Sequence, residues 1–162
     1  MDSLTPLTSR LGELLKNKQQ TIAVAESSTG GLICAALLAV PGASAYFVGG
    51  GVIYTRRSRD DLLGLTQEMI PAIRSSTEEY ARALAERVRN RLGTVWGLAE
   101  TGAAGPTGNR YGDAPGHSCI AVAGPVQRVL TLETGQTNRE ANMWAFTRAA
   151  LELLEAAVRA VG

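Results

Sequence analysis

The stretch TIAVAESSTGGLICAALLAV, residues 21–40, decides the fold of this chain. Residues 21–25 form a short run of β-branched and small apolar side chains, which predicts a buried strand. Polar residues and two glycines follow, and residues 32–40 then have the composition and length of a buried helix that ends at Pro41-Gly42. A strand that passes through a short glycine-containing turn into a helix is typical of α/β proteins.

The segments on either side continue this pattern. Hydrophobic periodicity and end signals predict helices at residues 4–15, 56–65, 77–92 and 137–161, the last capped near Asn138. Strands are expected at residues 46–55, 95–99, 119–123 and 127–133. Helices and strands alternate first, and a hairpin and a final helix follow. We therefore expect one domain over residues 1–162, an α/β fold in the form of a three-layer α/β/α sandwich with a mixed sheet.

Charge and composition exclude several classes of protein. The 16 Lys and Arg residues nearly balance the 15 Asp and Glu residues, which argues against a nucleic-acid or anionic membrane surface as partner. Residues 27–55 carry no charge, but Pro41-Gly42 and the glycines at 49–51 interrupt them, so no membrane span is expected. One histidine and two distant cysteines predict no metal site, and no cofactor is expected. We expect a cytoplasmic protein.

Two junctions between a strand and a glycine-rich loop are candidates for a functional site: AESSTGG at 25–31 and ETGAAGPTGNR at 100–110. Ligands of open α/β sheets bind beyond the carboxyl ends of strands. In the first junction, the run Ser27, Ser28 and Thr29 fits a helix N-cap. The same position also suits a nucleophilic serine with an oxyanion hole made of neighbouring amides. Both interpretations remain open at this point.

The second loop lacks the Gly-Lys-Ser/Thr ending of a P-loop, so hydrolysis of a nucleoside triphosphate is not indicated. Its glycines and Thr107 could still hold one phosphate in a backbone nest. A plain connecting loop is the alternative. His117 is the only histidine, and a Ser-His pair has no supporting spacing, so a bystander role is favoured for it.

In combination these segments resemble a known family. AES-x-TGG, PG-x-S, GG-x-x-Y and G-x-AGPTG occur in this order, and the resemblance to the CinA C-terminal domain family extends from residue 21 to the last helix. It implies an α/β/α sandwich, commonly a homodimer, that converts nicotinamide mononucleotide to nicotinic acid mononucleotide and ammonia. The substrate is then a small mononucleotide.

The resemblance also implies roles for particular residues. Ser27 matches the nucleophile and Tyr54 the nearby tyrosine, with Thr29, Gly30 and Gly31 expected to hold the oxyanion. The segment that matches the ligand-holding loop consists of Gly105, Pro106, Thr107 and Gly108, and His117 follows it along the chain as a further candidate contact to the substrate. A carboxamide is a poor electrophile, so an activated hydroxyl and a stabilised oxyanion suit this chemistry.

One position departs from the family pattern in a way that affects the chemistry. Arg59 stands where the family has a lysine that assists the serine. A guanidinium cannot be deprotonated in a protein, whereas a desolvated lysine can act as a base. Arg59 could bind an anion or support the oxyanion. The segment GNRYGDAPGH at 108–117 also replaces a shorter stretch of the family.

Two functional hypotheses follow. In the first, the protein is a working deamidase in which His117 or Tyr54 supplies the base. In the second, it is a homologue that binds a pyridine mononucleotide or a related ligand without turnover. A purely structural or partner-binding domain is a third possibility, because a fold does not fix a function.

Overall fold

The computed structural model describes the whole chain, residues 1–162. A five-stranded sheet with the order β2-β1-β3-β4-β5 forms its centre. The strands are β1 (Ile22–Glu26), β2 (Phe47–Val52), β3 (Trp96–Ala103), β4 (His117–Ala123) and β5 (Arg128–Glu133). β1 runs parallel to β2 and β3, whereas β4 is antiparallel to both β3 and β5. The expected mixed sheet is confirmed.

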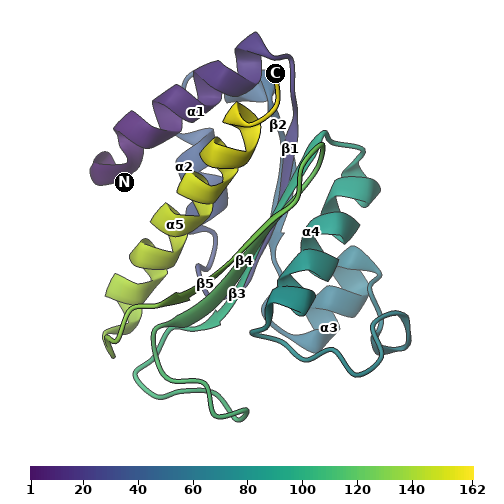
Figure 1. Ribbon diagram of the computed structural model, residues 1–162, viewed down its shortest axis with the longest axis vertical. Coiled ribbons are helices and arrows are strands. Elements are labelled where there is room, and N and C mark those ends of the chain that lie inside the picture. Colours follow the sequence, from purple (N-terminus) through teal and green to yellow (C-terminus); the bar gives the residue numbers. More distant parts are fainter.

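Helices cover both faces of the sheet. α1 (Thr5–Asn17), α2 (Leu32–Leu38) and α5 (Arg139–Arg159) pack on one face, and α4 (Glu78–Leu92) and the short α3 (Arg56–Ser58) lie on the other (Figure 1). This is the three-layer α/β/α arrangement that the sequence predicts. None of the helices is both long enough and apolar enough to cross a membrane.

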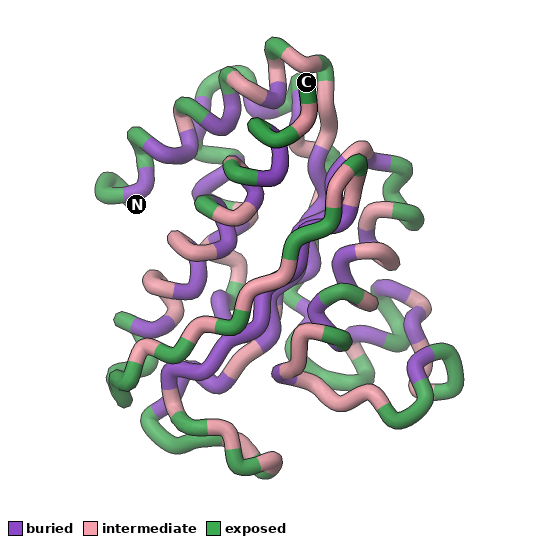
Figure 2. Tube along the Cα trace, viewed as in Figure 1, coloured by how far each residue is buried: buried purple, intermediate pink, exposed green.

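The two faces of the sheet differ in side-chain size. Large residues such as Ile22, Val24 and Trp96 face the layer of α1, α2 and α5. Small residues such as Ala23 and Ala99 face α4. The resulting buried band runs along the central strands (Figure 2). Small side chains on the α4 face let that helix approach the sheet closely, so that a Cβ on Gly97 would overlap backbone of α4.

Several expected boundaries are shifted. β2 ends at Val52 instead of residue 55, and β3 extends through Ala103, so that Gly102 belongs to the strand and not to the loop. The helix expected at 56–65 is one turn, α3, followed by the π-helical turn η3 (Arg59–Leu63). The cap at Asn138 is confirmed, because its side chain accepts a hydrogen bond from the amide of Ala141 at 2.9 Å.

The parallel pairing of β1 and β3 positions the first junction. Ala25 pairs with Ala99, and the next residue of each strand is a glutamate, Glu26 and Glu100. The carboxyl ends of both strands therefore meet at the same edge of the sheet, and Ser27 follows β1 directly.

Candidate functional site

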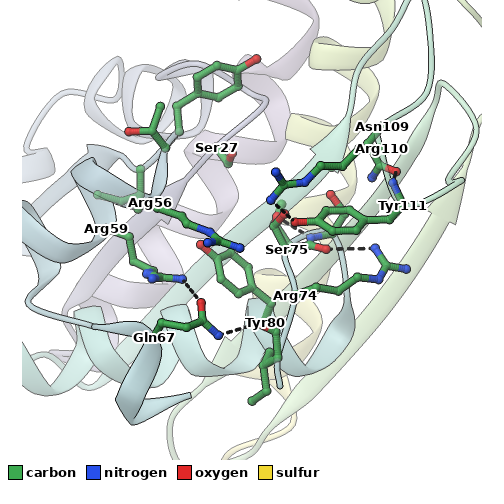
Figure 3. Close-up of a pocket in the computed structure, with 17 residues that line it drawn as sticks. Ser27, Arg56, Arg59, Gln67, Arg74, Ser75, Tyr80, Asn109, Arg110 and Tyr111 are labelled. Carbon is green, nitrogen blue, oxygen red and sulfur yellow. Dashed lines mark hydrogen bonds between the residues drawn. The ribbon is translucent and has the colours of Figure 1, made fainter. Parts of the chain in front are cut away.

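A cavity of about 490 Å³ opens at this edge of the sheet (Figure 3). Ser27 lines it from the end of β1, and Thr101 and Gly102 line it from the end of β3. Further lining comes from the segment after β2, the segment before α4, and residues 109–111 of the loop between β3 and β4. Parts of both glycine-rich junctions thus share one cavity, at the position where α/β sheets bind ligands.

Glu100 holds the loop that carries Ser27. Its side chain is fully buried, and one carboxylate oxygen accepts hydrogen bonds from the amides of Ser27 at 3.1 Å and Thr29 at 3.0 Å. The other oxygen accepts from the hydroxyls of Ser28 and Ser118. Burial raises the pKa of Glu100, although these hydrogen bonds act in the opposite direction. The position of the Ser27 backbone is therefore fixed by a carboxylate beneath it.

Glu26 provides the cap of α2. Its carboxylate accepts from the amides of Gly31 at 2.8 Å, Ile33 at 3.2 Å and Cys34 at 2.8 Å, and from the hydroxyl of Thr29 at 2.6 Å. The residue at the N-cap position itself is Gly31, with no side-chain cap. The hypothesis that the serine and threonine side chains cap this helix is therefore wrong, because a carboxylate from the preceding strand takes that role.

These contacts also correct the expected oxyanion hole. Thr29 is completely buried, and its amide donates to Glu100. The amide of Gly30 donates to the carbonyl of Ser27 at 3.1 Å, and that of Gly31 donates to Glu26. None of the three residues lines the cavity. Their amides hold the turn together and are not free for a ligand oxygen.

Three of the expected site residues do line the cavity: Ser27, Tyr54 and Arg59. The phenol oxygen of Tyr54 accepts a hydrogen bond from Arg139 at 3.2 Å. Arg59 is only 2% exposed and donates to Asp60 at 3.0 and 3.1 Å and to Gln67 at 3.3 Å. The buried guanidinium is thus paired on the wall of the cavity.

The other expected contacts lie elsewhere. Gly105, Pro106, Thr107 and Gly108 do not line the cavity. Gly105 is buried and its carbonyl accepts from Arg139 at 2.6 Å, while the next three residues are exposed on the surface. The expectation that this segment contacts a ligand beside Ser27 is therefore not met.

His117 is also outside the cavity lining. Its Nε2 donates to the carbonyl of Ser76 at 2.8 Å, and its Nδ1 contacts the carboxylate of Glu133. Burial by itself would lower the pKa of His117, but the hydrogen bonds to Glu133 and Ser76 and the charges of Asp113 and Glu133 outweigh it, so the pKa is raised. An imidazolium with both nitrogens engaged cannot take the proton of Ser27, which corrects the hypothesis that His117 is the base and the expectation that it contacts substrate.

Arginine is the residue type that the sequence argument missed. Arg56, Arg59, Arg74 and Arg110 all line the cavity, and the lining contains no Asp, Glu, His, Lys or Cys side chain. The signal was present in the pairs Arg56-Arg57 and Arg110-Tyr111. Only the fold shows that these distant segments meet at one cavity. No group of three or more His, Cys, Asp or Glu side chains is arranged to hold a metal ion.

The fold and this cavity define an α/β/α protein with a ligand site at the carboxyl ends of parallel strands. The CinA C-terminal domain family matches residues 4–158, and the chain belongs to this family. A CinA-like protein of Desulfosudis oleivorans is 39% identical over 155 residues, which are 94% of this chain and 37% of that protein. A CinA-like protein of Gloeobacter violaceus is 41% identical over 91% of this chain and 35% of its own length. The chain thus spans about a third of these relatives.

Solved structures agree with the fold. The competence/damage inducible protein CihA from Agrobacterium tumefaciens has a TM-score of 0.88 and 28% identity, with 96% of this chain and 95% of that chain covered. A competence-damaged protein (CinA) superfamily protein from Escherichia coli has a TM-score of 0.87 and 25% identity, over 93% of this chain and 88% of that one.

We expect the two buried glutamates to respond differently to amide substitution. Both oxygens of Glu26 accept backbone N–H groups, so Glu26→Gln directs an NH₂ group at an amide and should lower the free energy of unfolding by about 2–3 kcal/mol. In Glu100→Gln the NH₂ group can face the hydroxyls of Ser28 and Ser118, which can accept, so the loss should stay below about 1 kcal/mol. Urea denaturation of both variants measures this, and equal losses would contradict the assigned roles.

His117 should make the stability depend on pH. Because its folded pKa is raised above 6.5, its contribution is fully present below the unfolded pKa and is lost as the pH rises through the folded pKa. The difference in unfolding free energy between the wild type and His117→Gln should therefore be largest near pH 6 and shrink toward about pH 9. A difference that stays constant over this range would show that His117 is not charged in the fold.

Proposed function

We propose that this chain binds nicotinamide mononucleotide in the cavity and hydrolyses its carboxamide with Ser27 as the nucleophile. The observation that carries the proposal is the combination of Ser27, held by Glu100 at the cavity wall, with four guanidinium groups in the same lining. A serine next to a cationic cavity suits a substrate that has both a carboxamide and a phosphate. Membership of the CinA C-terminal domain family supports the same substrate through the resemblance described above.

In the proposed reaction, Oγ of Ser27 attacks the carbonyl carbon of the carboxamide. The C–N bond breaks, ammonia leaves with the proton taken from the serine, and an ester between Ser27 and the nicotinoyl group forms. Water then attacks the ester carbonyl and releases nicotinic acid mononucleotide and free Ser27. Splitting the hydrolysis into two steps lowers the barrier of each one.

The oxyanion donor in this proposal is the amide of Ser28. The other amides from Ser27 to Gly31 donate to Glu26, Glu100 or the Ser27 carbonyl, whereas the amide of Ser28 has no acceptor within the protein. The residue after a nucleophile at a turn from strand to helix supplies the same donor in α/β-hydrolases. The charge of Arg59 in the cavity lining adds a favourable field for the oxyanion.

The proton acceptor has to be a cavity phenol, because Arg59 stays protonated and His117 lies outside the lining. Tyr54, Tyr80 and Tyr111 are the cavity side chains that can exchange a proton at accessible pH. Burial raises the pKa of Tyr80, whereas hydrogen bonds with Arg110 and Ser75 lower the pKa of Tyr111. The rate should therefore increase toward alkaline pH, without an inflection in the histidine range.

The second candidate function is binding of the mononucleotide without turnover. The specific observation in its favour is Arg59, which is buried and paired with Asp60 at the position of the family lysine. Under this hypothesis the cavity keeps its affinity for the anion and has lost the base.

Ammonia release from nicotinamide mononucleotide distinguishes the two candidates. We expect release by the wild type and a loss of at least about 100-fold in Ser27→Ala, because the attacking oxygen is removed. Ser28→Ala is the matched control, since it keeps the backbone amide and changes only a hydroxyl that faces Glu100. Unchanged release in Ser27→Ala would remove Ser27 from the mechanism. Saturable binding in calorimetry without any release would establish the binding homologue.

Arg59→Lys tests whether the arginine limits the rate. A lysine in this desolvated position can lose its proton and act as a base, and general bases contribute about 10²–10⁴-fold, so ammonia release should increase at least about tenfold. Arg59→Gln is the control, because it removes the charge without adding a base and should give no increase. Equal rates in the wild type and Arg59→Lys would show that a base at this position is not the missing element.

A further inference from the structure

Two of the four cavity arginines have no acidic partner. Arg59 pairs with Asp60, and Arg74 pairs with Asp113 at 2.8 Å. Arg56 and Arg110 have no carboxylate within 4.0 Å, although both are exposed. The uncompensated charge of the cavity is therefore located on these two guanidinium groups.

Both arginines are presented by ordered turns. The Asn109 side chain accepts from the amides of Tyr111 at 3.0 Å and Asp113 at 3.1 Å, which fixes the turn that contains Arg110. The phenol oxygen of Tyr111 accepts from Arg110 at 2.7 Å. Arg56 begins α3 just after Thr55, whose side chain forms a reciprocal capping box with Ser58. Ordered donors lose little conformational entropy when an anion binds.

The two arginines face the same part of the cavity. In Figure 3, Arg56 and Arg110 extend into it from opposite sides, with Tyr111 beside Arg110. The pKa of Tyr111 agrees with this arrangement, since hydrogen bonds with Arg110 and Ser75 lower it first and the charges of Arg110 and Arg56 lower it further. The side chain of the neighbouring Arg57 is 91% exposed and pairs with Asp61, outside the lining.

We propose that Arg56 and Arg110 form a subsite for a terminal phosphomonoester, and that this subsite selects a mononucleotide over its riboside and over a dinucleotide. A phosphomonoester carries about −1.5 to −2 charges at pH 7 and matches two unpaired guanidinium groups, which can each donate two hydrogen bonds to it. Neither a riboside nor a pyrophosphate diester places that charge on one group. The subsite deepens the proposed function by naming the feature of the substrate that the cavity recognises.

Arg56 and Arg110 also lie where this chain departs from its family. Arg110 belongs to the segment at 108–117 that replaces a shorter stretch, and Arg56 belongs to the segment after Tyr54 that replaces a YSN-type sequence. The glycine loop at 105–108 is outside the cavity lining. The phosphate contact is thus assigned to residues that are particular to this chain.

Calorimetric titration of the wild type, Arg56→Gln, Arg110→Gln and the control Arg57→Gln tests the subsite. The ligands are nicotinamide mononucleotide, nicotinamide riboside and nicotinamide adenine dinucleotide. We expect each cavity substitution to weaken mononucleotide binding about 10- to 100-fold, because a charge-assisted hydrogen-bonded contact is lost. Arg57→Gln should bind like the wild type. The riboside and the dinucleotide should bind weakly and respond little to these substitutions.

The outcomes separate the subsite from the amidase proposal. Mononucleotide binding that depends on both arginines supports the subsite even when no ammonia is released. Ammonia release that depends on Ser27 but is unaffected by Arg56→Gln and Arg110→Gln would overturn the subsite and leave the amidase. Equal losses for mononucleotide and riboside, tighter binding of the dinucleotide, or no binding of the mononucleotide to the wild type would also overturn it.

Discussion

The candidate site depends on two buried carboxylates that have no cationic partner. Glu26 and Glu100 end adjacent parallel strands, and both accept hydrogen bonds only from amides and hydroxyls of the protein. Burying a carboxylate without such donors would be prohibitive. The turn from Ser27 to Gly31 therefore has to stay in the one conformation that turns its N–H groups inward. Thr29 joins the two carboxylates through its hydroxyl, so the end of β1, the end of β3 and the start of α2 form one unit.

This arrangement has a consequence for ligand binding. A glycine-rich turn at a helix start normally offers its amides to an anion. Here the carboxylate of Glu26 occupies that position at the start of α2, and an external anion would be repelled from it. Positive charge for a ligand has to come from side chains, and the cavity supplies it from loops outside the turn. The turn supplies a fixed serine, and the arginines supply the field.

The sequence was sufficient to predict the layers, the mixed sheet and the meeting of the two junctions, because strand and helix periodicities are local signals. It was insufficient at positions where a distant partner decides the outcome. Ser27, Ser28 and Thr29 look like a cap on local preference, yet the cap comes from Glu26. A glutamate at the end of each apolar strand, IAVAE and WGLAE, was the available signal for this.

The arginine cluster was out of reach of local patterns for a different reason. Arg56 and Arg110 are separated by more than a third of the chain, and an exposed arginine in a loop is usually solvated. Their role emerges only from charge pairing in the fold: Arg59 and Arg74 have acidic neighbours and Arg56 and Arg110 do not. The same accounting gives the substitution at Arg59 a physical meaning. A guanidinium neutralised by Asp60 keeps the cavity wall intact but cannot exchange a proton, so catalysis at Ser27 has to use a phenol of the cavity or be absent.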